Sequence, residues 1–105
     1  MAHEIAIGGA DSLAEGQRKL VFVGGGRSVV VFNVAGRLRA IENSCPHNGA
    51  SLANGRLDGS VLTCPAHGLR FDLDAGCTPG AGKLCLDFLP IRTVDGQLMI
   101  TIDVQ

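Results

Sequence analysis

Four residues of this chain have the types and spacing of metal ligands: Cys45, His47, Cys64 and His67. They form a C-x-H segment and a C-x-x-H segment with sixteen residues between them. Each segment therefore supplies one thiol and one imidazole. Such a mixed set is typical of a two-iron, two-sulfide cluster in which both cysteines bind one iron and both histidines bind the other.

This ligand set makes the cluster less negative than four thiolates would. Replacing two of four thiolates by neutral imidazoles removes two negative charges, so the cluster is easier to reduce than one with thiolates alone. The neighbouring residues suit loops that enclose such a group. Pro46 and Pro65 follow the two cysteines and stiffen the turns. Gly49 and Gly68 allow backbone N–H groups to approach the sulfur atoms closely.

The two segments resemble the cluster-binding motifs of Rieske proteins, and the similarity extends from about Leu13 to Ile102. In particular, the chain resembles the small soluble Rieske-type ferredoxins of bacterial aromatic-ring dioxygenase systems. That resemblance implies one [2Fe-2S] cluster per chain. It also implies that Cys45 and Cys64 bind the inner iron, and that His47 and His67 bind the outer iron near the surface.

Four positions depart from the respiratory members of that family. Ala50 and Ala66 stand where those proteins have a pair of disulfide-forming cysteines, so no disulfide is expected to join the two loops. Leu69 and Phe71 stand where those proteins have a serine and a tyrosine that donate hydrogen bonds to sulfur. Fewer donors stabilise the reduced state less, so we expect a potential near the low end of the Rieske range, about −150 mV.

Length and composition predict one soluble domain spanning residues 1–105. The apolar content of 46% argues against disorder, and the net charge of −1 without a basic run argues against nucleic acid as a partner. No apolar stretch approaches the roughly 20 residues that span a bilayer. Residues 1–4 lack the features of a secretion signal, so we expect a cytoplasmic protein. In that compartment Cys77 and Cys85 are expected to be two reduced thiols.

The hydrophobic pattern predicts an all-β protein, because short apolar segments alternate with Gly-, Asp- and Asn-containing turns. We expect an antiparallel β sandwich or barrel with a small cluster-binding subdomain inserted at about residues 42–79, as in Rieske proteins. Pro79 matches the position of their cluster-covering loop. Asp95-Gly96 predicts a hairpin, and Gly24-Gly25-Gly26 predicts a turn and not a phosphate-binding loop. The expected strands are Glu4–Ile7, Lys19–Val23, Ser28–Asn33, Arg37–Glu42, Ser60–Thr63, Arg70–Asp72, Asp87–Val94 and Gln97–Asp103.

A structural zinc site is the main chemical alternative. Zinc sites commonly group like ligands, as a cysteine pair with a histidine pair, whereas each segment here mixes the two types. An oxygenase is excluded on different grounds. Its mononuclear iron needs two histidines and a carboxylate, and His3 is the one histidine outside the proposed ligand set.

The chain is therefore expected to be an electron carrier and not an enzyme. The resemblance implies that an NAD(P)H-dependent flavoprotein reductase supplies the electrons and that a terminal ring-hydroxylating oxygenase receives them. Both partners are expected to dock transiently near His47 and His67, on a face that includes Pro46, Asn48, Ala66 and Leu69. A small Rieske subunit of an assimilatory nitrite reductase is the alternative. Four arginines are also candidates for partner docking, and the sequence does not indicate which of them takes part: Arg37, Arg39, Arg56 and Arg70.

Overall fold

The structure is a computed structural model that describes residues 2–9, 13–24, 26–44, 51–65, 68, 70–74 and 85–103. Within these ranges the chain forms strands and turns, with no helix and hence none that could cross a membrane. The strands are β1 (Ala2–Gly9), β2 (Arg18–Gly24), β3 (Arg27–Val34), β4 (Arg37–Glu42), β5 (Arg56–Asp58), β6 (Val61–Thr63), β7 (Arg70–Asp72), β8 (Phe88–Leu89), β9 (Ile91–Val94) and β10 (Gln97–Asp103).

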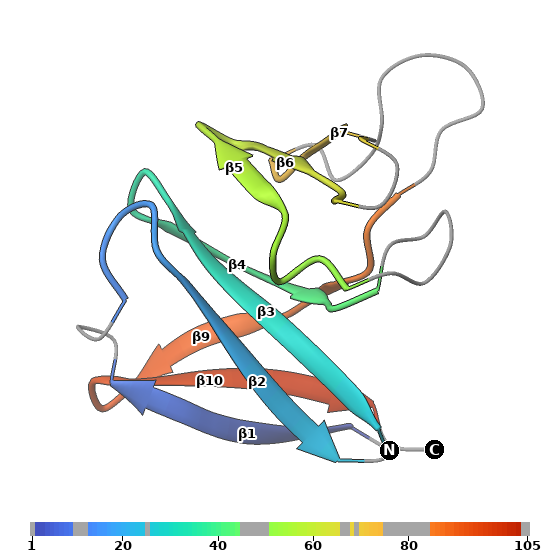
Figure 1. The fold of residues 1–105 in the computed structure, drawn as a ribbon. Helices are drawn as coiled ribbons and strands as arrows, with labels where there is room; N and C mark the ends of the chain where they lie inside the picture. Colours follow the sequence, from blue (N-terminus) through green and yellow to red (C-terminus); the bar gives the residue numbers. More distant parts are fainter. Residues whose placement is uncertain are drawn as a thin grey trace.

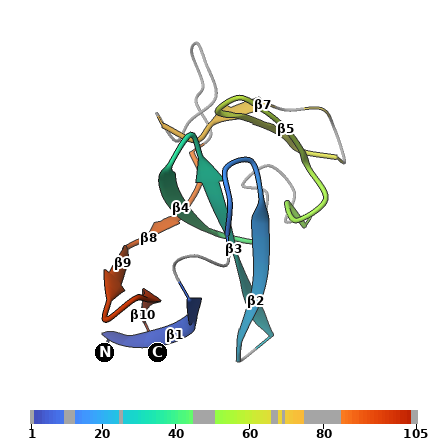
Figure 2. The same ribbon diagram turned by 90° about the vertical axis from the view of Figure 1, so that its left-hand side faces the viewer.

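Two antiparallel sheets form the base of the molecule (Figures 1 and 2). One has the order β1-β10-β9, so the first and last strands of the chain lie side by side. The other has the order β2-β3-β4-β8. Apolar side chains from both sheets pack together between them, including Val29, Val31, Ala40, Leu98 and Ile100, each at most 1% exposed. Burial of this apolar surface is the main force that joins the two sheets.

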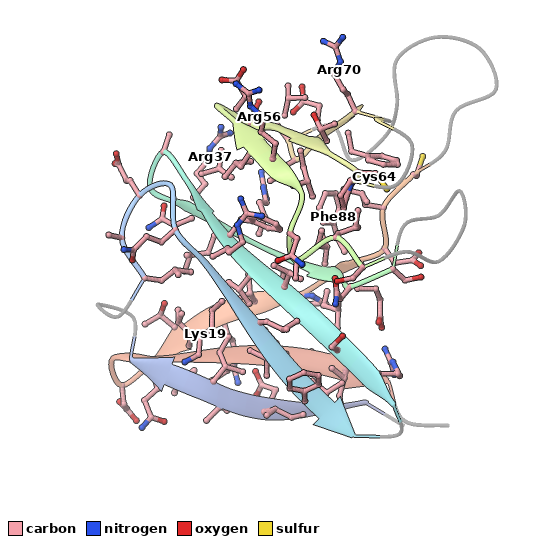
Figure 3. The ribbon with its side chains drawn as sticks, viewed as in Figure 1. Lys19, Arg37, Arg56, Cys64, Arg70 and Phe88 are labelled. Carbon is pink, nitrogen blue, oxygen red and sulfur yellow. The ribbon has the colours of Figure 1, made fainter. Side chains whose placement is uncertain are left out.

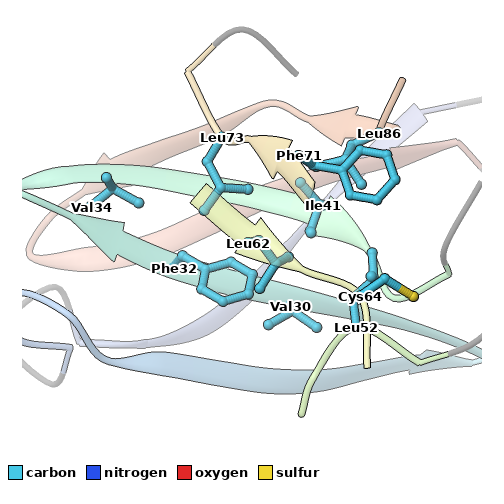
Figure 4. Packing of buried hydrophobic residues seen from close by; sticks show 10 residues of the cluster. All are labelled: Val30, Phe32, Val34, Ile41, Leu52, Leu62, Cys64, Phe71, Leu73 and Leu86. Atoms are coloured by element: carbon cyan, nitrogen blue, oxygen red, sulfur yellow. The ribbon is translucent and has the colours of Figure 1, made fainter. Parts of the chain in front are cut away.

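A third sheet, of order β5-β6-β7, packs on the opposite face of β3 and β4. Figure 4 shows the apolar cluster that fills this second interface, in which Phe32 and Ile41 from the base meet Leu62 and Phe71 from the small sheet. The central strand β3 is therefore covered on both faces. For that reason four consecutive residues, 29–32, are fully buried. In a sheet with one face in solvent, buried and exposed residues would alternate along the strand.

The predicted all-β fold with antiparallel sheets is confirmed, and three strands match the expected bounds to the residue: β4, β7 and β10. The predicted strand Asp87–Val94 is in fact two strands that meet at Pro90. β8 pairs with β4 in one base sheet, and β9 pairs with β10 in the other. Pro90 lacks an N–H group and stands where the chain changes sheets. The prediction missed β5, because a strand of three residues with charged ends carries almost no pattern.

Two turns show the left-handed backbone that closes a two-residue hairpin. Asp95 and Gly96 have φ angles of 51° and 77°, and Ala35 and Gly36 have φ angles of 53° and 87°. Positive φ at both central positions is the requirement of a type I′ turn, which matches the twist of the flanking strands. The Asp95-Gly96 hairpin is thus confirmed, and so is the turn between β2 and β3, where Gly24 and Gly26 have φ angles of 91° and 76°.

Candidate metal centre

Cys64 is the one proposed ligand among the described residues. It follows β6 directly, its thiol is free, and its side chain is fully buried at the end of the cluster formed with Leu52 and Phe71 (Figure 4). Cys45, His47 and His67 lie outside the described residues. The structure therefore places one of the four ligands, and the assignment of the complete set stays a prediction.

One backbone hydrogen bond links Cys64 with Gly68, four residues later. The backbone N–H of Gly68 donates a hydrogen bond of 2.9 Å to the carbonyl oxygen of Cys64. Gly68 has a φ angle of 71°, a conformation that other residues adopt only with strain. This bond from residue i+4 to residue i places the backbone of Gly68 beside that of Cys64, next to the buried thiol.

Asn43 ties together the two ends of the first ligand segment. Its side-chain Oδ1 accepts hydrogen bonds from Leu52 N at 2.7 Å, Ala53 N at 3.0 Å and Ser51 Oγ at 3.0 Å. Its Nδ2 donates to Ser28 Oγ at 3.1 Å, on strand β3. One amide thus connects the residues before the C-x-H segment with those after it and fixes both to the base sheet.

Arg18 fixes the stretch of chain between the C-x-H segment and β5. Arg18, on strand β2, donates from Nη1 to the carbonyl oxygens of Ala53, at 2.9 Å, and Gly55. Its guanidinium lies 5.1 Å from the centre of the Phe32 ring, a distance that suits a cation–π contact. A Cβ atom at Gly55 would lie 2.6 Å from the carbonyl oxygen of Thr63, so only glycine fits beside the strand that leads into Cys64.

These features fit a thiolate-ligated cluster on the side that the structure describes. Cys64 offers a buried, unpaired sulfur beside the backbone of Gly68, and the four ligand types together match two sulfur and two nitrogen donors. The described residues contain no group of three or more His, Cys, Asp or Glu side chains that could hold a metal, as expected when three ligands lie outside them. Ala50, Ala66, Leu69 and Pro79 also lie outside the described residues.

The expectation of two reduced thiols is wrong for Cys85, because the structure holds this residue in a disulfide bond. The other described cysteine, Cys64, is free and is therefore not its partner. Cys77 lies outside the described residues, so its state stays a prediction. The expectation rested on the redox state typical of a compartment. Disulfide formation also depends on which cysteines the fold brings within reach, and the sequence does not give that distance.

The sequence interpretation missed Asn43, Gly55 and Arg18. Only Gly55 left a local signal, because Asn54-Gly55 is a common turn dipeptide. Arg18 bonds to residues that are 35 and 37 positions later in the chain, and no local sequence pattern predicts such contacts.

A family profile described as "Rieske [2Fe-2S] domain" matches residues 3–87 of the chain. Among curated proteins, the ferredoxin component of the alkene monooxygenase system of Xanthobacter autotrophicus is 32% identical over 91 residues, which cover 86% of this chain and 74% of that protein. The ferredoxin component of the naphthalene 1,2-dioxygenase system of Pseudomonas putida is 35% identical over 80 residues, which cover 73% of this chain and 75% of that protein.

Solved structures show the same fold. The Sphingomonas yanoikuyae B1 ferredoxin superimposes with a TM-score of 0.81 at 25% identity, covering 96% of this chain and all of that one. A chain in the complex of reduced oxygenase and oxidized ferredoxin of carbazole 1,9a-dioxygenase superimposes with a TM-score of 0.82 at 26% identity, covering 92% of this chain and 91% of that one.

Proposed function

Because the chain belongs to the Rieske [2Fe-2S] family, we propose that it carries single electrons from an NAD(P)H-dependent flavoprotein reductase to a terminal oxygenase. The observation that supports this most is the pairing of a family match over residues 3–87 with relatives named as ferredoxin components of oxygenase systems. These relatives serve an alkene monooxygenase and a naphthalene dioxygenase. These names support an oxygenase as the proposed acceptor, with ring hydroxylation as one candidate reaction.

We propose that Cys45 and Cys64 bind the inner iron and that His47 and His67 bind the outer iron. When bound, the cluster supplies a centre that accepts and releases one electron. The described residues contribute the setting. Cys64 presents its sulfur from a fully buried position, which excludes water from that side of the site. The Gly68 N–H bond and the Asn43 amide fix the backbone at the edges of both segments.

The chain is a component of an oxygenase system and not its catalyst. Oxygen activation needs a second iron site, and His3 is the one histidine left for it. We propose that residues 1–105 form one domain in which about residues 42–79 make the cluster-binding subdomain. Partners would dock near His47 and His67, where imidazole ligands at the surface shorten the path of the electron.

Reconstitution tests this function directly. The holo-protein is mixed with NADH or NADPH, a flavoprotein reductase from the same organism and an oxygenase, and product is measured with and without the ferredoxin. We expect product formation to depend on the holo-protein and to be absent with the apo-protein. If reductases of the same organism do not reduce the holo-protein, it is not such a carrier.

A further inference from the structure

Two arginines differ from the other basic side chains that the structure describes. The chain has nine lysines and arginines, and eight of them lie in the described ranges. Six of these eight have a hydrogen-bond or ion-pair partner: Arg18, Lys19, Arg27, Arg37, Arg39 and Arg92. The remaining two, Arg56 and Arg70, are exposed and have no ion-pair partner among the described residues.

Arg56 and Arg70 belong to one row of one sheet. Arg56 on β5 is opposite Thr63 on β6, and Thr63 is opposite Arg70 on β7. Residues directly opposite each other in a sheet point to the same face, and two strand spacings separate the outer pair by roughly 10 Å. The neighbouring row, Leu57–Leu62–Phe71, points into the core, so the two arginines face solvent. Figure 3 shows them on the small sheet, on the side away from the base strands.

A shallow groove of about 300 Å³ runs along this face, and its lining includes Arg56, Thr63 and Arg70. Its other described lining residues are Asp58 and Val61. With Asp72 they form the next row on the same face, two residues along each strand, so two carboxylates lie beyond the two arginines. The arginine row is nearer the ligand. Thr63 immediately precedes Cys64, whereas Asp58 and Val61 lie at the far end of the strands. Positive charge is thus concentrated at the end of the face that adjoins Cys64.

We infer that the row Arg56–Thr63–Arg70 is a docking site for an acidic patch on the reductase that supplies electrons. This inference depends on the proposed carrier function. Two guanidiniums about 10 Å apart, with a hydroxyl between them, match a pair of carboxylates on a partner surface. The protein as a whole has a net charge of −1, so this row is a local departure from its overall charge.

Charge also indicates which partner uses the row. The reduced protein carries one more negative charge than the oxidised protein, so a carboxylate-rich partner binds the oxidised form more strongly. An electron donor must bind the oxidised protein and release the reduced one. An acidic reductase meets both requirements at this site, whereas an acidic acceptor would bind its substrate form, the reduced protein, less well.

Small charged oxidants test the electrostatic part without any partner protein. Reduced holo-protein is mixed in a stopped-flow instrument with ferricyanide, an anion, or with tris(phenanthroline)cobalt(III), a cation, each of which takes one electron. For Arg56→Gln/Arg70→Gln at low salt, we expect the ferricyanide rate constant to fall about three- to tenfold and the cobalt rate constant to rise. Both differences should shrink at high salt, because the Debye length falls to about 3 Å at 1 M.

Arg92→Gln is the matched control, because Arg92 is also exposed but lies on β9 in the base. It should leave the ratio of the two rate constants unchanged. An unchanged ratio in the double variant would overturn the inference, since the row would then not influence electron exchange. Visible absorption and midpoint potential are measured for each variant, and both should equal the wild-type values.

The reductase that reconstitution identifies tests the choice of partner. The double variant should raise the KM of this reductase for the oxidised ferredoxin about fivefold or more at low salt, with little change in kcat. Binding of the oxidised variant to the reductase, measured by calorimetry, should weaken in parallel. Weaker binding to the oxygenase, with reductase binding intact, would show that the choice of partner is wrong while leaving the carrier function in place.

Discussion

Asn43→Ala is expected to shorten the lifetime of the bound cluster. The substitution removes the acceptor of three hydrogen bonds, two of them from the backbone N–H groups of Leu52 and Ala53. Leu52 N is left without an acceptor, whereas Ala53 N keeps a longer bond of 3.3 Å to Ser51 Oγ. One partly buried donor without a partner costs about 1–3 kcal/mol, so we expect the free energy of opening this loop to fall by about 1–3 kcal/mol. A local opening that becomes 2 kcal/mol easier occurs about 30 times more often.

The assay follows the visible absorbance of the holo-protein in the presence of an iron chelator at fixed temperature. If cluster loss proceeds through opening of this loop, Asn43→Ala should lose its absorbance at least tenfold faster than the wild type. Asn43→Asp keeps an acceptor for Leu52 and Ala53 and loses the donor to Ser28. It should therefore show a smaller effect.

Asn33→Ala provides a matched control in the base. The Asn33 side chain also bridges two segments, donating to Leu13 O at 2.9 Å and accepting from Gly36 N at 2.9 Å. Its loss should lower the free energy of unfolding by about 1–2 kcal/mol without a specific effect on cluster loss. Equal cluster lifetimes in Asn43→Ala and Asn33→Ala would refute the claim that the Asn43 hydrogen bonds hold the first ligand segment closed.

Three further predictions concern Gly55, Cys64 and the ion pair between Glu4 and Arg92. Gly55→Ala should lower the free energy of unfolding by about 2–4 kcal/mol in denaturant titrations, because its Cβ would lie 2.6 Å from Thr63 O. Gly59→Ala, with φ of 61° in open space, should cost only about 1 kcal/mol. Cys64→Ala, which leaves no donor atom, should abolish visible absorbance while far-UV circular dichroism still shows β structure; a coloured variant would exclude Cys64 as a ligand. The hydrogen bond from Arg92 lowers the pKa of Glu4 below its ordinary value of 4.5, so this pair contributes stability above that pH and loses it as the pH falls through the lowered pKa. Glu4→Gln should therefore unfold with a weaker dependence on pH below 4.5 than the wild type, and identical pH profiles would contradict the pairing.

The sequence predicted the parts of this fold that local pattern controls. Strands β4, β7 and β10 and the Asp95-Gly96 turn follow from apolar segments bounded by turn residues. The four-residue ligand pattern led to the family because ligand type and spacing are local properties of each segment. Residues 29–32 of β3 are apolar without interruption, because both faces of this strand are buried. A continuous apolar run is compatible with a buried strand, so the prediction of a strand was still possible.

What the sequence did not predict depends on contacts between distant residues. Nothing in the local sequence marks Asn43, two residues before Cys45, as structurally important. Its role appears only in the fold, where residues 51–53 lie beside it. The state of Cys85 depends on a spatial approach of the same kind. Arg56 and Arg70 differ from Arg37 and Arg39 only because Asp74 pairs with the latter two in the folded protein.

The central claim is that two irons are held by different ligands, sulfur from Cys45 and Cys64 on one and nitrogen from His47 and His67 on the other. Pulsed electron paramagnetic resonance of the reduced native holo-protein tests it most directly, because nitrogen ligands of an iron split the signal through hyperfine coupling. We predict couplings to two histidine nitrogens. A reduced cluster without nitrogen coupling, or a colourless protein that contains one zinc and gives no signal, would contradict the claim.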